Sequence, residues 1–467
     1  MIKLSNLDAA FIHLETPTSP MHIGAVMCFS AAGETPMSLS RLKAHVSSRL
    51  DVHPLFRRRL KSRRLGLEYE WEEVSELSLD HHIRGLRYPG PLNEDTLSEL
   101  TAKFFAQPLD RARPLWEILY IERKPDPEGI RHFDTGHEYA FVGIIKVHHA
   151  AVDGVSAEVV MTALLDGLPA PINSSGTTRG QANLWPVRLR HSATQVWARL
   201  NRRPWRDLPY YMQAPKTPFG VATIEDRQHI CLSLPMKQLQ AIKGSLPGAT
   251  LNDVIVSVVG GGLRGYLLEQ DKLPQQPLIA MTPVSRRADK QDVGGNQVSA
   301  MLIELATDEE CPRLRLAKVH ACSVVAKDYN QHLQIESLFA SLPSHAVSLS
   351  LKAWTAAGLT ELLPSLFNVI ITNVPGSRQP LSLAGFPLEA MHGVAPVYAG
   401  HALTIVVLSY RDNVSLSLSC TRSSVTNPIA MRRHLQHAME DLSRACGVAK
   451  PAVKVARTLG VSEESVA

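Results

Sequence analysis

Apolar and polar positions alternate in two different ways along the first third of the chain. The runs at 22–30 and 139–147 are rich in apolar and β-branched residues, as strands are. Residues 39–50 and 93–107 place their apolar side chains at helical spacing, and Asn93 is a suitable N-cap for the second helix. We therefore expect this part of the chain to fold as a sheet with helices.

The same two patterns return after residue 221. Residues 250–270 predict a buried helix that three consecutive glycines, Gly260 to Gly262, would loosen, and residues 428–446 predict a final helix. A second sheet should accompany these helices. Its strands are expected at 278–285, 298–306, 366–374, 402–410 and 414–421.

The stretch between these two parts differs in composition. It opens with small, polar and proline-bearing residues, which are typical of a linker. Residues 186–206 then concentrate arginine around Trp197 and Trp205, a pattern of either a solvated helix face or a segment that lies on a charged surface. The arginines are Arg188, Arg190, Arg199, Arg202, Arg203 and Arg206.

The chain is thus expected to have three parts, at 1–168, 169–220 and 221–467. Its 467 residues exceed what one hydrophobic core usually holds, which favours two domains. The expected fold class is α/β (α+β), with two similar domains, each a mixed sheet with helices, joined by a crossover linker.

Composition narrows the class of protein. The net charge of +5 is too mild to require a nucleic acid partner. No run approaches the ~18 apolar residues of a membrane span, so any membrane contact should be peripheral. The N-terminus lacks the apolar run of a signal peptide, and no two of the six cysteines have CxxC spacing, which favours reduced thiols in a cytoplasm.

The stretch VHHAAVDGVS at 147–156 carries the candidate chemistry. A strand that ends here would place His148 and His149 on opposite faces, so that one can face a cleft while the other supports it. Neutral imidazole suits proton transfer near pH 7. Gly154 permits a tight turn after the pair, and Asp153 could anchor that turn.

Other readings of a histidine pair compete with proton transfer. The pair at His81 and His82 lacks the following Asp-Gly, and we interpret it as structural. His132 and His137 are close enough in sequence to suggest a metal site, but no HExxH motif is present, so we expect no metal. A serine hydrolase is disfavoured because the chain contains no GxSxG stretch.

The full HHxxxDG pattern at 148–154 is similar to the signature of the acyltransferases that include chloramphenicol acetyltransferase, carnitine acyltransferases and peptide-synthetase condensation domains. PLWE at 114–117, NDVIVSVV at 252–259 and TNVPGS at 372–377 resemble elements of the bacterial wax ester synthase/diacylglycerol acyltransferases. The opening at 7–24 resembles theirs as well. The departures from the family pattern, Thr372 and Ser377, bear on acceptor selectivity.

This resemblance implies two chloramphenicol-acetyltransferase-like domains with the active site between them. It implies acyl transfer from acyl-CoA, a co-substrate, to a long-chain alcohol or to diacylglycerol, without a resident cofactor. Carried over by motif, His149 is the general base, His148 supports it, Asp153 is structural and Gly154 shapes the turn.

Further residues are expected near the substrates. Asn252 is either a donor to the oxyanion or the N-cap of its helix, while Asp253 should fix structure. The other candidates form two groups, one at the cleft and one in packing or the wall of an acyl channel. They are Asn373, Pro375 and Gly376, and then Pro114, Leu115 and Trp116.

Water-insoluble acceptors would have to come from a lipid surface. The arginine-rich segment at 186–206 is the candidate contact with an inner membrane or lipid droplet, the alternative being a helix that crosses between domains. The basic run at 57–64 would meet phosphates of acyl-CoA or anionic lipid, or form a solvated loop. A homodimer is left open. Two other functions also stay open: an acyltransferase of the condensation or polyketide-associated type with a carrier-protein donor, and a non-catalytic lipid-binding relative.

Overall fold

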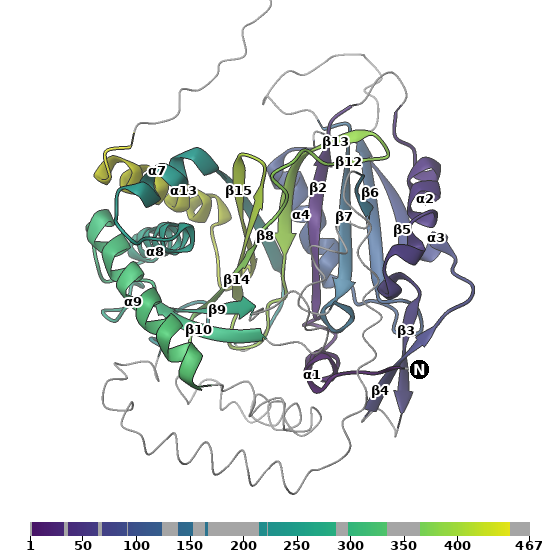
Figure 1. The fold of residues 1–467 in the computed structure, drawn as a ribbon, viewed down its shortest axis with the longest axis horizontal. Helices are drawn as coiled ribbons and strands as arrows, with labels where there is room; N and C mark the ends of the chain where they lie inside the picture. Colours follow the sequence, from purple (N-terminus) through teal and green to yellow (C-terminus); the bar gives the residue numbers. More distant parts are fainter. Residues whose placement is uncertain are drawn as a thin grey trace, which may run out of the picture.

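Two six-stranded sheets stand side by side at the centre of the computed structural model (Figure 1). Both are mixed, because each combines parallel and antiparallel neighbours. The structure describes residues 2–31, 36–63, 68–90, 92–123, 139–152, 164–166, 214–221, 223–285, 298–333 and 365–448.

The first sheet has the strand order β12-β13-β2-β7-β6-β5. Helix α2 (Leu39–Ser47) packs against this sheet, and helix α4 (Glu94–Ala106) packs between it and the second sheet. The strands are β2 (His22–Phe29), β5 (Ile83–Tyr88), β6 (Trp116–Arg123), β7 (Phe141–His148), β12 (Ser382–Leu383) and β13 (Phe386–Val394).

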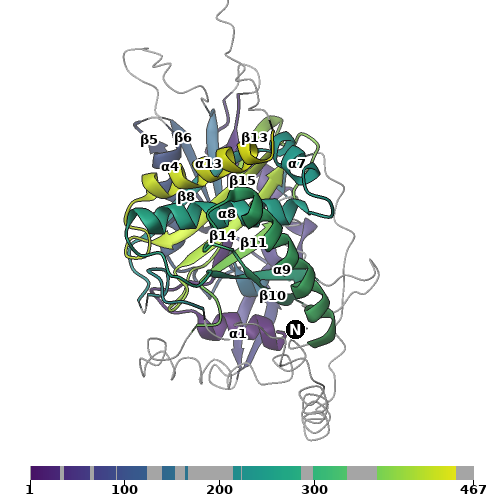
Figure 2. The ribbon, with the colours of Figure 1, turned by 90° about the vertical axis from the view of Figure 1, so that its left-hand side faces the viewer.

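The second sheet has the order β10-β9-β11-β14-β15-β8. Its strands are β8 (Arg227–Pro235), β9 (Ile279–Ser285), β10 (Val298–Glu304), β11 (Val369–Val374), β14 (Leu403–Tyr410) and β15 (Asn413–Thr421). One face is covered by α7 (Met236–Gly244), α8 (Leu251–Glu269), α9 (Pro312–Leu333) and α13 (Pro428–Ala445), which Figure 2 shows in front of the strands.

Strand β13 ties the two parts together. It follows β11 in the chain, yet it pairs with β2 of the first sheet along its whole length. Its His392 also meets the second sheet, with Nδ1 3.1 Å from Oγ of Ser415 on β15. Most of the expected linker, through residue 213, lies outside the described residues, so the three-part division stays a prediction.

The helices and strands expected from periodicity are present, with ends shifted by a few residues. Asn93 caps α4, since its Oδ1 accepts from the Thr96 N–H at 2.9 Å. The expected loosening of α8 at its glycines is wrong, because the helix runs through them unbroken. A Cβ at Gly260 would lie 2.2 Å from the Leu305 carbonyl oxygen, so these glycines permit close packing instead.

Residues 58–63 of the basic run do not form a loop, so the solvated-loop interpretation is wrong for them, while a contact with phosphates or anionic lipid stays a prediction. Residues Arg58–Arg63 form strand β3, which pairs with β4 (Glu68–Glu73), and β4 pairs with the short β1 (Ile2–Lys3). The alternating acids of β4 pair with three of the basic side chains of β3. The ion pairs are Arg59–Glu72, Lys61–Glu72 and Arg63–Glu70.

Two expectations from composition can be compared with the described residues. All six cysteines are free thiols, as predicted. No helix among the described residues is long and apolar enough to cross a membrane.

Candidate active site

The histidine pair lies where strand β7 ends, as the sequence predicts. His148 is the last residue of the strand and pairs with His22 of β2, and a short 3-10 turn (His149–Ala151) begins at His149. The main chain fixes both residues from two sides. The His148 N–H donates to the Leu115 carbonyl at 3.0 Å, and the His149 N–H donates to the Met21 carbonyl at 2.8 Å.

His148 is buried and its tautomer follows from its hydrogen bonds. Its Nδ1 accepts from the Ala150 N–H at 3.1 Å, which leaves Nε2 as the ring nitrogen that carries a proton. Nε2 lies 3.4 Å from Oε1 of Glu15. His148 therefore points away from solvent and toward a carboxylate, which is the geometry of a supporting residue.

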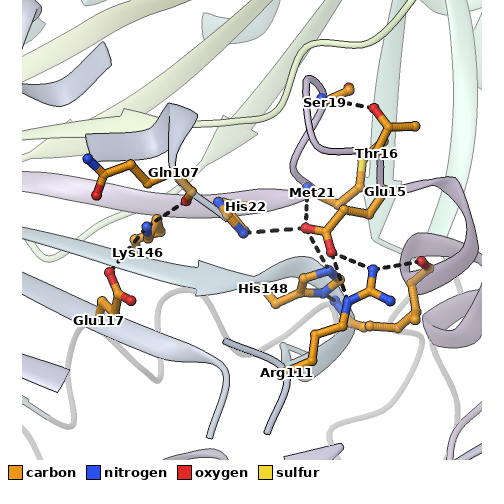
Figure 3. A network of polar contacts seen from close by, with 12 residues as sticks. Glu15, Thr16, Ser19, Met21, His22, Gln107, Arg111, Glu117, Lys146 and His148 are labelled. Atoms are coloured by element: carbon orange, nitrogen blue, oxygen red, sulfur yellow. Dashed lines mark hydrogen bonds and ion pairs between the residues drawn. The ribbon is translucent and has the colours of Figure 1, made fainter. Parts of the chain in front are cut away.

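Glu15 gathers partners from three other parts of the chain (Figure 3). Its Oε2 accepts from Arg111 Nε at 3.1 Å and Nη2 at 2.5 Å, while its Oε1 accepts from the Met21 N–H at 3.2 Å. Nε2 of His22 lies 3.4 Å from the same Oε1. Burial opposes the charge of Glu15, but its contacts with His148, His22 and Arg111 outweigh burial and hold the pKa of this carboxyl far below its usual range.

A buried lysine lies two residues before the pair on the same face of β7. Nζ of Lys146 donates to the Phe104 and Gln107 carbonyls at 3.1 and 2.8 Å and lies 3.3 Å from Oε2 of Glu117 (Figure 3). Burial lowers its pKa. Because the two carbonyls close the C-terminal end of α4, this lysine fixes that helix to the strand that carries the histidines.

His149 packs against the N-terminal helix α1 (Asn6–Leu14). The Phe11 ring stacks on the imidazole with centroids 3.9 Å apart and planes 18° apart. Burial lowers the pKa of His149 to about 4, although a hydrogen bond between the ring and the residue's own main chain partly opposes this. The ring is therefore neutral at pH 7 and keeps one nitrogen lone pair that can accept a proton.

A main-chain hydrogen bond holds the PLW element at 114–116 beside the histidine pair. Pro114, Leu115 and Trp116 are all buried, and the Leu115 carbonyl holds the His148 N–H. Trp116 Nε1 donates to the Phe56 carbonyl at 3.2 Å. The prediction that this tryptophan belongs to the core is confirmed.

The second pair, at His81 and His82, is structural, as predicted. The His82 ring is buried and stacks on Trp116 with centroids 4.3 Å apart. Its Nδ1 lies 2.8 Å from the Trp116 carbonyl. His82 therefore supports the packing of β6, while His81 is exposed.

Asn252 and Asp253 occupy the first turn of α8. The N-cap interpretation of Asn252 is wrong, because Thr250 caps the helix in a reciprocal capping box with Asp253. Asp253 fixes structure, as expected, since its Oδ2 also lies 2.9 Å from Nδ1 of His320. Within the described residues neither side chain bonds to the histidine pair, so the role of Asn252 as an oxyanion donor stays a prediction.

The TNVPGS element lies at the end of β11. Asn373 and Pro375 are exposed, and the Gly376 N–H donates to Ser409 Oγ at 3.1 Å. A Cβ at Gly376 would lie 2.1 Å from the Ser409 carbonyl oxygen, so glycine is required for this close approach. A cleft-lining role for these three residues stays a prediction.

Four residues named from the sequence cannot be placed. Asp153 and Gly154, which complete the motif, and His132 and His137, the alternative metal ligands, lie outside the described residues. The roles assigned to Asp153 and Gly154 therefore stay predictions.

Sequence reasoning missed Glu15, Phe11 and Arg111. Glu15 and Phe11 lie in the opening segment that resembles the family, but nothing in that segment distinguishes them from their neighbours. The sequence offers one weak indication for Glu15: a glutamate at the end of a short apolar helix is a candidate partner for a distant buried histidine.

Comparison with known proteins agrees with this geometry. The model of the wax ester synthase/diacylglycerol acyltransferase catalytic domain matches residues 4–255, and that of the C-terminal domain of the same family matches 294–443. A relative from Mycobacterium tuberculosis that carries the name diacylglycerol O-acyltransferase is 32% identical, over 95% of this chain and 100% of its own.

Solved structures point to the same family and fold. The wax ester synthase/diacylglycerol acyltransferase from Marinobacter aquaeolei superimposes with a TM-score of 0.70 and 26% identity, covering 96% of this chain and all of its own. A trichothecene 15-O-acetyltransferase from Fusarium sporotrichioides, at 15% identity, shares the fold with a TM-score of 0.57 over 95% of this chain and 94% of its own.

The expected fold class is thereby confirmed, and the carrier-protein and non-catalytic alternatives are not favoured. The chain belongs to the wax ester synthase/diacylglycerol acyltransferase family and is an acyl-CoA-dependent acyltransferase.

Proposed function

We propose that His149 acts as the general base in transfer of a long-chain acyl group from acyl-CoA to the hydroxyl of a long-chain alcohol or of diacylglycerol. The observation that carries this proposal is a half-buried, neutral imidazole directly after β7, stacked on Phe11. An alcohol keeps its proton at neutral pH and is a poor nucleophile until a base removes it. Such a base typically contributes ~10²–10⁴ in rate.

The reaction needs no covalent enzyme intermediate, because a thioester carbonyl is already electrophilic. His149 takes the hydroxyl proton while the alcohol oxygen attacks the carbonyl carbon. The tetrahedral intermediate then expels the coenzyme A thiolate, which recovers the proton from the imidazolium. The products are an ester and free coenzyme A. No metal or resident cofactor takes part in this scheme.

His148 and Glu15 support the base without touching the reacting atoms. The Glu15 carboxylate lies 3.4 Å from Nε2 of His148, and the Glu15 main-chain N–H closes α1 by donating to the Phe11 carbonyl at 3.2 Å. The same residue therefore positions both the neighbouring imidazole and the helix that packs on His149.

We also propose that the enzyme collects its acceptor at a lipid surface, as a cytoplasmic protein on an inner membrane or lipid inclusion. The support is chemical, since long-chain alcohols and diacylglycerol are almost insoluble in water. The segment at 186–206, with its six arginines and two tryptophans, is the proposed contact. It lies outside the described residues.

The test of function uses purified protein, labelled palmitoyl-CoA and either hexadecanol or dipalmitoylglycerol, with the lipid products separated by polarity. We expect wax ester, triacylglycerol or both. Palmitoyl-acyl-carrier protein as a second donor distinguishes the alternative, because turnover of that donor alone would contradict dependence on acyl-CoA.

A further inference from the structure

A large cavity opens where the two sheets approach each other at α4. It has a volume of about 810 Å³. Its walls come from α4, from β8 and the segment before it, from the N-terminal end of α13 and from the turn at Thr18. Helix α4 lies against β8 in the fold (Figure 1), so α4 and strand β8 of the second sheet contribute two of its walls.

The cavity contains an arginine that lacks a carboxylate partner. Within the described residues, the only hydrogen bond of the Arg227 guanidinium is to the Thr18 carbonyl at 3.3 Å, and it forms no ion pair. Burial lowers the pKa of Arg227 to about 10. A partly buried cation without a counter-charge is costly, and an anionic ligand would relieve that cost.

Two further arginines face the same space. Arg422 is exposed and has no ion pair among the described residues, while Arg432 bridges Glu94 and Asp95. The N-terminal end of α13, at Pro428 and Ile429, lines the cavity as well, and a helix N-terminus favours negative charge.

The acidic side chains of the cavity do not cancel these groups in its interior. Asp95 is engaged by Arg432 and Glu99 by Lys103, while Glu225 and Asp226 are exposed. The positive charge of Arg227 thus lies deeper than the unpaired negative charge.

A buried histidine supplies a neutral polar group. His229 is 4% exposed and lines the cavity, and neither of its ring nitrogens has a hydrogen-bond partner among the described residues. Burial lowers its pKa to about 3, so the ring is neutral and offers one donor and one acceptor. Gln228 Oε1 and Ser98 Oγ are buried, line the cavity and lack partners in the same way.

Two walls of the cavity are close in sequence to residues that position the histidine pair. Thr18 belongs to the turn that follows Glu15, whose carboxylate contacts His148. Ala106, on the opposite wall, precedes Gln107, whose carbonyl is held by Lys146 of β7. Both walls are thus anchored to the residues that position the proposed base.

We propose that this cavity binds the coenzyme A part of the acyl-CoA donor, with Arg227 and Arg422 contacting its phosphates and His229 and Gln228 its pantetheine amides. The proposal rests on the proposed function. The ligand chemistry matches the cavity, because coenzyme A combines a phosphate-rich end with an amide-bearing arm. Arginine suits phosphate through its planar fork of donors.

The other basic cluster of the described chain is a weaker candidate for this role. Three of its side chains on β3, those of Arg59, Lys61 and Arg63, are already paired with the acids of β4. Binding phosphates there would require breaking those pairs, whereas Arg227 has none to break.

The test compares two donors with the same thioester carbonyl, palmitoyl-CoA and palmitoyl-N-acetylcysteamine, which lacks the phosphates. We expect Arg227→Gln to lower the preference for palmitoyl-CoA, as the ratio of the two kcat/KM values, by roughly 10- to 100-fold, as expected for a lost hydrogen bond to a charged group. Arg227→Lys should retain more of the preference. The Kd of free coenzyme A, measured by calorimetry, should rise in parallel for Arg227→Gln.

Two further variants keep the test decisive if Arg227→Gln does not fold. Ala102→Phe adds bulk from the α4 wall without removing a charge, and it should lower the same ratio. Arg433→Gln is the matched control, because Arg433 neighbours Arg432 on α13 but pairs with Glu269 outside the cavity, and its ratio should equal that of the wild type.

Each outcome bears on one claim. An unchanged ratio and an unchanged coenzyme A Kd in folded Arg227→Gln and Ala102→Phe proteins would overturn the cavity proposal while leaving the acyltransferase function intact. If the wild-type protein turns over neither donor, the proposed function fails. The coenzyme A Kd then still decides whether the cavity binds this ligand.

Discussion

Replacing Glu15 by glutamine should destabilise the protein and slow acyl transfer together. Glu15 is 8% exposed at its side chain, and its two oxygens serve different partners. Oε2 holds Arg111, while Oε1 faces the Met21 N–H and the Nε2 atoms of His22 and His148. An amide keeps only one oxygen, so one of these two sets must face an NH₂ group instead.

The size of the stability loss depends on which of the two groups of partners loses its carboxylate oxygen. Arg111 is 40% exposed at its side chain and can recover solvation, so the amide nitrogen should turn toward it. The lost charge-assisted pair then costs about 2–3 kcal/mol, which is below the full cost for a completely buried pair. Because the Glu15 carboxylate also lies 3.4 Å from Nε2 of His148, which supports the proposed base, we expect kcat to fall by about tenfold in addition.

The assay combines urea unfolding with initial rates on palmitoyl-CoA and hexadecanol. Glu72→Gln is the control, since Glu72 also pairs with an arginine and a lysine but lies on the exposed sheet of β3 and β4. Its loss of stability should be much smaller. Wild-type stability and turnover in Glu15→Gln would refute the view that this carboxylate organises the site.

Three further outcomes are expected. Asp153→Asn should lower the melting temperature as well as activity, and an unchanged melting temperature with lost activity would instead indicate a direct catalytic role. The free energy of unfolding should fall as the pH drops from about 6.5 toward 4, because buried histidines such as His22 and His392, with pKa lowered to about 4, are protonated mainly in the unfolded chain. Each of these histidines should cost up to ~2 kcal/mol of stability between pH 7 and 5, which urea unfolding at each pH measures. A stability that does not change with pH over this range would contradict their burial. Reversing Arg199, Arg202, Arg203 and Arg206 to glutamate should abolish binding to anionic vesicles in a flotation assay while turnover of a short soluble alcohol survives, and vesicle binding as tight as that of the wild type would reduce segment 186–206 to a linker.

Local periodicity predicted about half of the strands and helices that the structure describes, and it could not predict which sheet each strand joins. Strand β13 lies late in the chain and still completes the first sheet beside β2. That pairing is a long-range event, and no local pattern at 386–394 encodes it.

The site shows the same division between local and distant information. The histidine pair could be predicted because its motif is contiguous. The Glu15 carboxylate could not, since Arg111 is 96 positions away and its importance arises only when α1 meets the end of β7. The charges on β3 were misread for a related reason, because the acids that neutralise them lie on another strand.

The most direct test of the account is the single-turnover rate of His149→Ala with palmitoyl-CoA and hexadecanol, measured beside its melting temperature. Because only the proton acceptor is removed, the account predicts a rate at least ~10²-fold below that of the wild type in a protein that stays folded. A folded His149→Ala protein that transfers palmitate at close to the wild-type rate would contradict it.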